Sequence, residues 1–150
     1  MTAFVDTNVV VRYLTGEPEH LATIASRILN GEDDIVLTAG VLAEVAYVLR
    51  RLYDVPRETV VDSLIHLVRK ANITVWGLDQ DVIIQALLMC RPSGRVAFAD
   101  AMLWSVARSA GSDSVVYTLD ARFPNVGIEI RQQPPGRDEA NRSGPASWGT

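Results

Sequence analysis

The sequence predicts an α/β protein, a three-layer α/β/α sandwich with a central, mostly parallel sheet flanked by helices. Short β-branched runs alternate with longer helical patterns along the chain, which is typical of parallel strands that are joined by helices. The chain of 150 residues has the size of one domain, and its hydrophobic content of 48% is sufficient for a buried core. These observations exclude a disordered chain and a coiled-coil rod.

The individual elements follow from apolar periodicity and from the residues that begin and end them. Pro18 and Pro56 are favoured in the first turn of a helix, and Gly16 and Gly111 are expected to end helices. Helices are expected at about 8–14, 18–30, 41–53, 56–70, 79–90 and 98–110. Strands are expected at about 3–5, 35–38, 73–75, 115–118 and 128–130.

The C-terminal part of the chain has a different composition from the rest. Residues 132–150 contain three of the seven prolines and three of the ten glycines, and few apolar side chains. Such a stretch buries too little surface to offset the entropy that it would lose on ordering. We therefore expect one folded domain over residues 1–131, followed by a flexible tail over residues 132–150.

Charge and cysteine content exclude several classes of protein. The formal net charge of −4 argues against a protein that coats nucleic acid through broad electrostatic attraction, although local binding at a cation site stays open. The single cysteine, Cys90, excludes an internal disulfide framework and a zinc site built from several thiolates. No apolar run approaches the roughly 20 residues that span a bilayer, and the N-terminus lacks the pattern of a signal peptide. We expect a cytoplasmic protein without membrane association.

Four acidic residues occupy positions where a purely solvating role is hard to accept. Asp6 and Asp120 each follow a predicted strand, and ligands gather at the carboxyl ends of strands in open α/β sheets. Glu44 lies at the margin of an apolar helical stripe, and Asp100 lies in the first turn of a helix. Simpler interpretations stay open, with Asp6 as a helix cap, Glu44 as a surface residue near the edge of the stripe and Asp120 as the cap of a short turn. Their joint placement nevertheless predicts that the four carboxylates meet in a single pocket.

Converging carboxylates repel one another, and a hard divalent cation removes that repulsion. Mg²⁺ and Mn²⁺ prefer oxygen ligands, keep bound waters and are commonly shared with substrate phosphates. Such a cation lowers the pKa of a bound water and neutralises charge on a phosphoryl group. The acidic residues therefore predict metal-assisted chemistry on a phosphate ester.

Four short motifs resemble, in their order, those of the PIN-domain ribonucleases. They are FVDTNV at 4–9, the helix that carries Glu44, FADA at 98–101 and YTLDARF at 117–123. Each motif alone is weak, but four in the order of the family are specific. In spacing and total length the chain looks most like the VapC toxins of bacterial toxin–antitoxin pairs, and the resemblance covers about residues 2–131.

This resemblance implies a PIN-like fold and a Mg²⁺- or Mn²⁺-dependent endoribonuclease that hydrolyses RNA phosphodiester bonds. It also implies a homodimer that is silenced by a cognate antitoxin at the active site. The residues that match the catalytic and metal-binding acids of the family are Asp6, Glu44, Asp100 and Asp120. Those that match its supporting polar positions are Thr7, Asn8 and Thr118.

Other polar and aromatic residues carry weaker functional signals. Thirteen of the 14 basic residues are arginines, so any phosphate would be bound mainly by planar guanidinium groups. The arginines expected near the cleft, as possible contacts to the RNA backbone, are Arg12, Arg91, Arg95 and Arg122. Two isolated histidines, His20 and His66, do not suggest a catalytic pair, and Cys90 is expected to be a buried, inert thiol.

Three other functions compete with the toxin interpretation. A housekeeping RNA-processing nuclease would use the same site, and sequence chemistry does not separate it from a toxin. A receiver-like signalling module would accept phosphate on an aspartate, but Lys70 lies inside a helical pattern rather than at a strand end. A member of the fold that binds without cutting is disfavoured because all four acids are present.

Overall fold

The computed structural model describes residues 1–136, so residues 137–150 of the expected tail lie outside the described part of the chain. Its longest helices have 13 residues each, and no helix in residues 1–136 is long and apolar enough to cross a membrane. The helices are α1 Thr7–Thr15, α2 Glu19–Leu29, α3 Ala39–Arg51, α4 Arg57–Val68, α5 Gln80–Met89 and α6 Phe98–Ala110. The strands are β1 Thr2–Phe4, β2 Asp34–Leu37, β3 Ile73–Val75, β4 Val115–Tyr117 and β5 Glu129–Arg131.

Every expected helix and strand is present, with ends that differ by at most a few residues, and local capping explains most of these ends. Asp6 caps α1, and the Thr38 hydroxyl caps α3 by accepting a hydrogen bond from the Val41 amide. Gly16 ends α1 in the left-handed conformation, with a φ of 72° that favours glycine.

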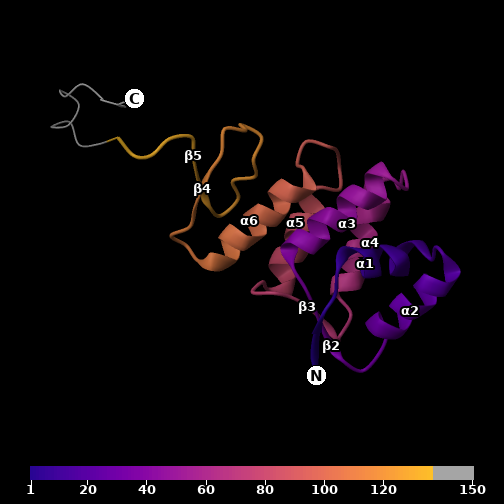
Figure 1. The fold of residues 1–150 in the computed structure, drawn as a ribbon. Helices are drawn as coiled ribbons and strands as arrows, with labels where there is room; N and C mark the ends of the chain where they lie inside the picture. The colour runs from indigo at the N-terminus through magenta and orange to yellow at the C-terminus, as the bar shows by residue number, and fades with distance from the viewer. Residues whose placement is uncertain (137–150) are drawn as a thin grey trace, which may run out of the picture.

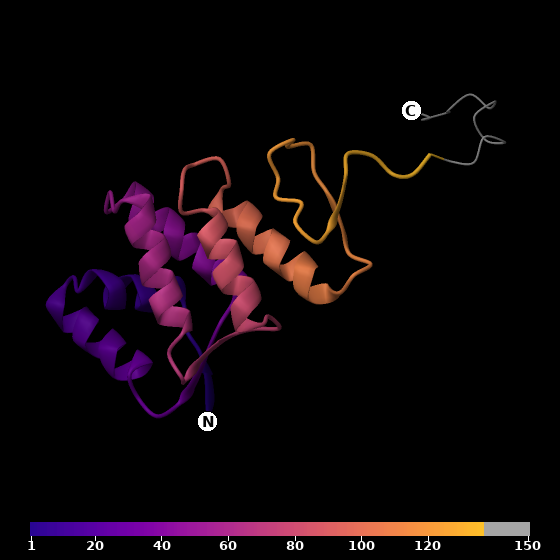
Figure 2. The ribbon, with the colours of Figure 1, turned by 180° about the vertical axis from the view of Figure 1, so that it is seen from behind.

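The strands are arranged in parallel, with helices packed around them, and the expected three-layer α/β/α fold class is confirmed. The strands β1, β2 and β3 form one sheet in that order, and β4 pairs with β5 in a second sheet. Both views of the ribbon show β4 and β5 on the far side of α6 from the first sheet (Figures 1 and 2). The central sheet that the sequence predicted is therefore divided into two sheets, and α6 lies between them.

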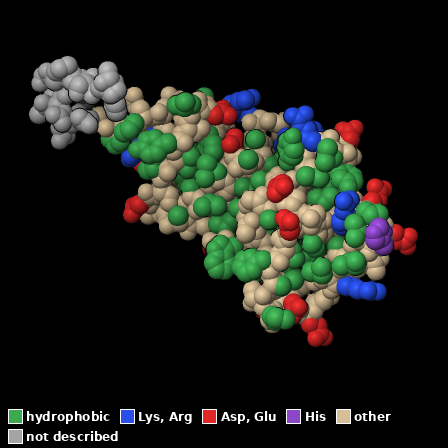
Figure 3. Space-filling view, viewed as in Figure 1, with side chains coloured by type: hydrophobic (Ala, Val, Ile, Leu, Met, Phe, Trp, Pro, Cys, Tyr) green, Lys and Arg blue, Asp and Glu red, His purple; other side chains and the backbone are tan. Residues whose placement is uncertain are grey.

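The core lies between the first sheet and the helices. Ile35, Leu37 and Ile73 are at most 4% exposed on the covered face of the sheet, and the fully buried Trp104 anchors α6. In Figure 1, α1 and α2 lie on one side of α3, and α5 and α6 lie on the other. The space-filling view from the same side shows hydrophobic side chains over much of this face, with acidic and basic side chains scattered among them (Figure 3).

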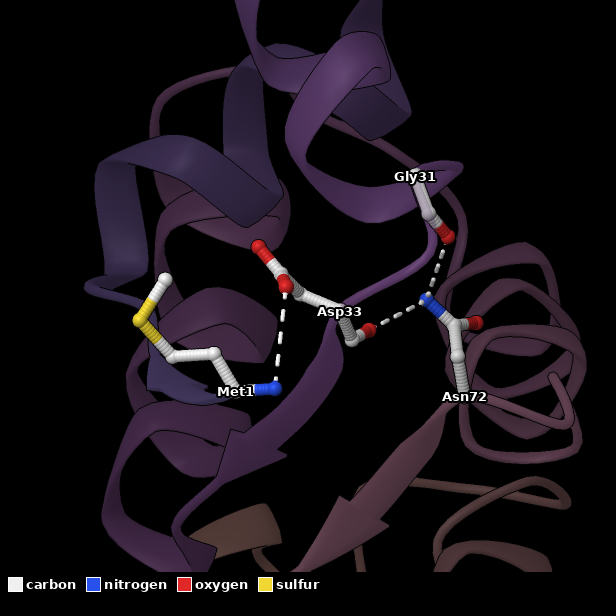
Figure 4. A network of polar contacts seen from close by, with 4 residues as sticks. All are labelled: Met1, Gly31, Asp33 and Asn72. Carbon is white, nitrogen blue, oxygen red and sulfur yellow. Dashed lines mark hydrogen bonds and ion pairs between the residues drawn. The ribbon is translucent and has the colours of Figure 1, made fainter.

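Polar contacts fix the amino-terminal edge of the first sheet. The Asn72 side-chain amide donates to the carbonyl oxygens of Leu29, Gly31 and Asp33, at 3.1 to 3.5 Å. The Met1 amino group lies 4.0 Å from the Asp33 carboxylate (Figure 4). These contacts join the turns before β2 and β3 to the start of β1. Asp6 and Thr7 follow the opposite edge of the sheet, where β1 ends.

Candidate functional site

An acidic cavity of about 260 Å³ lies where the N-terminal part of α1 meets α3. Parallel packing brings these helices together, because α1 follows β1 directly and α3 follows β2, its neighbour in the sheet. The residues that line this acidic cavity are Asp6, Thr7, Asn8, Val11, Arg12, Glu44, Val48, Leu52 and Tyr53. Five of the residues that the sequence analysis singled out line this cavity together, namely Asp6, Thr7, Asn8, Arg12 and Glu44.

The Asp6 carboxylate caps α1 with one oxygen and has a second oxygen beside the cavity. Its Oδ1 accepts a hydrogen bond from the Thr7 amide at 2.7 Å, so the residue caps α1 as its simpler interpretation predicted. A carboxylate has a second oxygen with its own lone pairs. Asp6 therefore retains an oxygen for a ligand in the cavity while its first oxygen fixes the start of the helix.

Thr7 joins the two helices of the site. Its side chain is only 6% exposed, and its Oγ1 donates to Glu44 Oε2 at 2.8 Å across 37 residues of sequence. The following residues of α3, Val45 and Ala46, are fully buried, so the backbone that carries Glu44 is fixed by the core. Glu44 is exposed, as the simpler interpretation of a surface residue at the stripe edge has it, and it also lines the acidic cavity.

Arg12 is the basic residue of the same cavity, and Tyr53 holds its guanidinium. The Arg12 guanidinium donates through Nη1 to the Tyr53 hydroxyl at 3.1 Å and to the Glu17 carbonyl oxygen at 3.2 Å. The sequence analysis placed Tyr53 at the end of the helix expected at 41–53 without a role, because its contact with Arg12 spans 41 residues of sequence. A guanidinium has five N–H donors, so Arg12 can still bind an anion.

The other two predicted acids lie outside the lining of the acidic cavity. Asp100 lies in the first turn of α6, as predicted, and is half-buried. Asp120 follows β4, where its Oδ1 accepts a hydrogen bond from the Arg122 amide at 2.8 Å and so caps a short turn. The Thr118 hydroxyl accepts from the Asp120 amide at 3.1 Å. The expected meeting of all four carboxylates in one pocket is therefore not seen in residues 1–136, and a role for Asp100, Asp120 and Thr118 beside Asp6 stays a prediction.

The donor chemistry of the acidic cavity fits a hard divalent cation with few protein ligands. In residues 1–136, no group of three or more His, Cys, Asp and Glu side chains is placed to hold a metal ion together. The cavity offers two carboxylates, from Asp6 and Glu44. Mg²⁺ commonly binds through one or two carboxylates and completes its coordination with water and substrate phosphate. Asp6 and Glu44 are therefore the residues that would hold such an ion.

The remaining arginines of the sequence prediction have different surroundings. Arg91 makes two hydrogen bonds to Asp62, at 2.9 and 3.0 Å, and this contact lowers the pKa of the Asp62 carboxyl. Arg122 Nε lies 3.6 Å from the Asp120 carboxylate, and Arg95 is exposed in the loop before α6. None of the three lines the acidic cavity.

Cys90 is the buried thiol that the sequence predicted. It is fully buried, and its Sγ contacts the Ala86 carbonyl oxygen at 3.5 Å. Burial raises its pKa to about 11, so the thiol is neutral at physiological pH. Both His20 and His66 are exposed and lie outside the lining of the acidic cavity.

The comparisons with known proteins decide the family. The model of the PIN domain matches residues 3–129, which span β1 to the start of β5 and include all four predicted acids. The chain belongs to the PIN domain family. PIN domains are generally Mg²⁺-dependent nucleases, so a divalent cation agrees with the oxygen donors of the cavity. No curated protein and no solved structure matches the chain.

Proposed function

We propose that this PIN domain is a metal-dependent endoribonuclease that hydrolyses RNA phosphodiester bonds. The observation that carries the proposal is the hydrogen bond from Thr7 to Glu44, which holds a carboxylate of α3 over the Asp6-capped start of α1. Two carboxylates that share one cavity are suited to a cation that also binds phosphate. Bound Mg²⁺ would supply charge neutralisation at the phosphate and a more acidic water.

The residues of the cavity have separate roles in this proposal. Glu44 has one oxygen fixed by Thr7 and offers its other oxygen to the cation. Asp6 orients the start of α1 with one oxygen and offers the other to the cation. Arg12 is held by Tyr53 and can donate to a phosphate oxygen of the RNA.

Cleavage of RNA by the purified protein tests this proposal. We expect cleavage with Mg²⁺ or Mn²⁺, none in excess chelator, and a loss of at least 100-fold in Asp6→Asn and in Glu44→Gln. Asp81→Asn is the matched control, because it removes the same charge from an exposed position in the first turn of α5. Full cleavage by Asp6→Asn, or cleavage that survives the chelator, would contradict the proposal.

The same assay decides the roles of the two more distant acids. We propose that Asp100 and Asp120 also contribute to the metal site, as the PIN motifs imply. Asp100→Asn and Asp120→Asn are then expected to lose activity as Asp6→Asn does. Activity equal to that of the Asp81→Asn control would restrict the metal site to Asp6 and Glu44.

We also propose that the nuclease is a toxin of the VapC type, silenced by a cognate antitoxin and assembled as a homodimer. An apolar groove of about 250 Å³ on α2 supports the antitoxin, since Leu21, Ile24 and Ile28 line it. Asn8 and Arg12 line both this groove and the acidic cavity. A partner segment that is seated in the groove would therefore reach the catalytic carboxylates.

Expression in a bacterial host separates a toxin from a housekeeping RNA-processing nuclease. A toxin is expected to arrest growth on induction, and both the Asp6→Asn variant and co-expression of the protein encoded beside it should relieve the arrest. Sequencing of RNA 5′ ends after induction would identify the substrate. Unchanged growth together with cleavage in vitro would favour the processing nuclease instead.

A further inference from the structure

A second cavity, of about 660 Å³, opens on a neighbouring face of α3. We name it the arginine pocket after the side chains that it gathers from α3, from α4 and from the start of α6. The residues that matter for its chemistry are Tyr47, Arg50, Arg51, Asp54, Arg57 and Phe98.

The arginine pocket is positively charged in a protein whose formal net charge is −4. Three guanidinium groups, from Arg50, Arg51 and Arg57, face one carboxylate, that of Asp54. Within residues 1–136, the ion pairs shorter than 4.0 Å involve other residues, so these three arginines have no carboxylate partner there. A local excess of positive charge in a hollow attracts anions, and phosphate groups above all.

Two of these arginines are held in place by the fold. Arg50 donates through Nη1 to the Val55 carbonyl oxygen at 3.0 Å. Arg57 donates through Nη1 to the Cys90 carbonyl oxygen at 3.1 Å, and its Cζ lies 4.9 Å from the centre of the Phe98 ring. Each guanidinium keeps further N–H donors for a ligand. Such fixed groups lose little conformational entropy when they bind a phosphate.

The start of α6 borders the arginine pocket, and its first turn also carries the Asp100 carboxylate. Ala97 caps this 13-residue helix without a side-chain hydrogen bond, and Ala97, Phe98 and Ala99 all line the pocket. The first N–H groups of a helix have no partner within the helix and carry its positive dipole end. Because Asp100 offsets part of this dipole, the preference of the hollow for a phosphate comes mainly from the arginines.

Tyr47 gives the pocket a surface for a base. Its ring is 61% exposed, and the Cζ of Arg51 lies 5.8 Å from the ring centre. Glu44, Tyr47 and Arg51 lie within about 60° of one another around the axis of α3, because a helix turns about 100° per residue. Glu44 and Arg51 are separated by about 10 Å along that axis, roughly three stacked nucleotides.

We infer that the arginine pocket binds a nucleotide of single-stranded RNA about three nucleotides from the site of cleavage. Arg50 and Arg51 pair with its phosphate, and its base stacks on Tyr47. This inference rests on the proposed ribonuclease function and adds to it the residues that bind the substrate. It also moves the expected phosphate contacts from the loop arginines Arg91 and Arg95 to α3.

Binding of short fluorescein-labelled oligouridine and oligoadenosine, measured by anisotropy in the presence of chelator, tests the inference without cleavage. Arg51→Ala is expected to weaken binding about fivefold or more, and to reduce the slope of log affinity against log salt by about 0.7. Tyr47→Ala is expected to weaken binding about fivefold or more, and Tyr47→Phe to restore it. Arg69→Ala is the control, because Arg69 is exposed at the end of α4.

The outcomes distinguish the failure of this inference from that of the proposed function. RNA binding that depends on Arg51 and Tyr47 supports the pocket even when Mg²⁺ produces no cleavage, and only the nuclease proposal then fails. Cleavage with unchanged RNA affinity in Arg51→Ala overturns the pocket alone. Binding of polyaspartate in place of RNA, lost in Arg51→Ala, would also overturn it and indicate an acidic protein partner.

Discussion

Replacement of Thr7 by valine tests the contact on which the acidic cavity depends. Valine keeps the β-branched shape of threonine and fills the same buried space, but it cannot donate to Glu44 Oε2. A hydrogen bond to a charged group contributes about 1.5–3 kcal/mol in buried surroundings. Because Glu44 is exposed and can bind water instead, we expect Thr7→Val to lower the free energy of unfolding by only about 1 kcal/mol.

The expected loss of activity is larger than the loss of stability. Thr7 acts as a positioning residue, so its loss leaves Glu44 free to change rotamer and lowers kcat about tenfold or more, with little effect on KM. Thr7→Ser keeps the hydroxyl and should retain most of both quantities. Glu44→Gln still offers an amide oxygen to Thr7, so it should remain stable while losing cleavage.

Urea denaturation and single-turnover RNA cleavage measure these two effects. A double-mutant cycle of Thr7→Val with Glu44→Ala should give a coupling free energy of about 1 kcal/mol, because the two side chains share one hydrogen bond. A coupling near zero would refute the reasoning, as would equal losses of kcat in Thr7→Val and Thr7→Ser.

Two further predictions concern stability. Gly16→Ala should lower the free energy of unfolding, measured in urea, by about 1 kcal/mol, because a φ of 72° is strained for alanine. The added Cβ meets no atom within 4 Å, so this backbone strain is the whole expected effect. Gly40→Ala, inside α3, should raise it, and equal effects would contradict the strain argument. From pH 9 to 11 the unfolded Cys90 thiol loses its proton while the folded one, with a pKa of about 11, retains it. Wild-type stability should therefore fall by roughly 2 kcal/mol relative to Cys90→Ala, whereas parallel pH profiles would contradict this.

The elements of the fold could be predicted because their signals are local. Apolar spacing defines the buried face of α3, and cap residues such as Asp6 and Gly16 define the ends of helices within a few residues. The association of strands depends instead on contacts between distant segments. Strands of three residues, such as β4 and β5, carry too few side chains to specify which neighbour they pair with.

The two acids that line the cavity, Asp6 and Glu44, were also singled out by local signals. Asp6 follows a strand, and Glu44 lies beside buried residues, so each stands out in its own segment. The link between them was not predictable, because Thr7 donates to a residue 37 positions away. The PIN motifs matched Thr7 by position, but only the packing of α1 on α3 gives its hydroxyl a partner.

The sequence does not show which of its arginines lie beside a cavity and which pair with a carboxylate. Arg91 was selected because it is expected near the cleft, and in the structure its guanidinium contacts Asp62. The sequence analysis did not single out Arg50 and Arg51, which lie in the last turn of α3. Only the packing of α6 beside α3 shows that they face a hollow, and that distinction is tertiary.

One helix carries both halves of the proposed substrate site. The buried residues Leu42, Val45 and Leu49 fix α3 in the core, so the spacing between Glu44 and Arg51 is set by helix geometry and not by a flexible loop. The carboxylate at the middle of α3 suits a cation, and the arginines at its C-terminal end suit a phosphate about three nucleotides further along the strand. An RNA strand that binds both sites would be held in one register. The arginines would thereby position a polyanion beside the two carboxylates of the acidic cavity, Asp6 and Glu44.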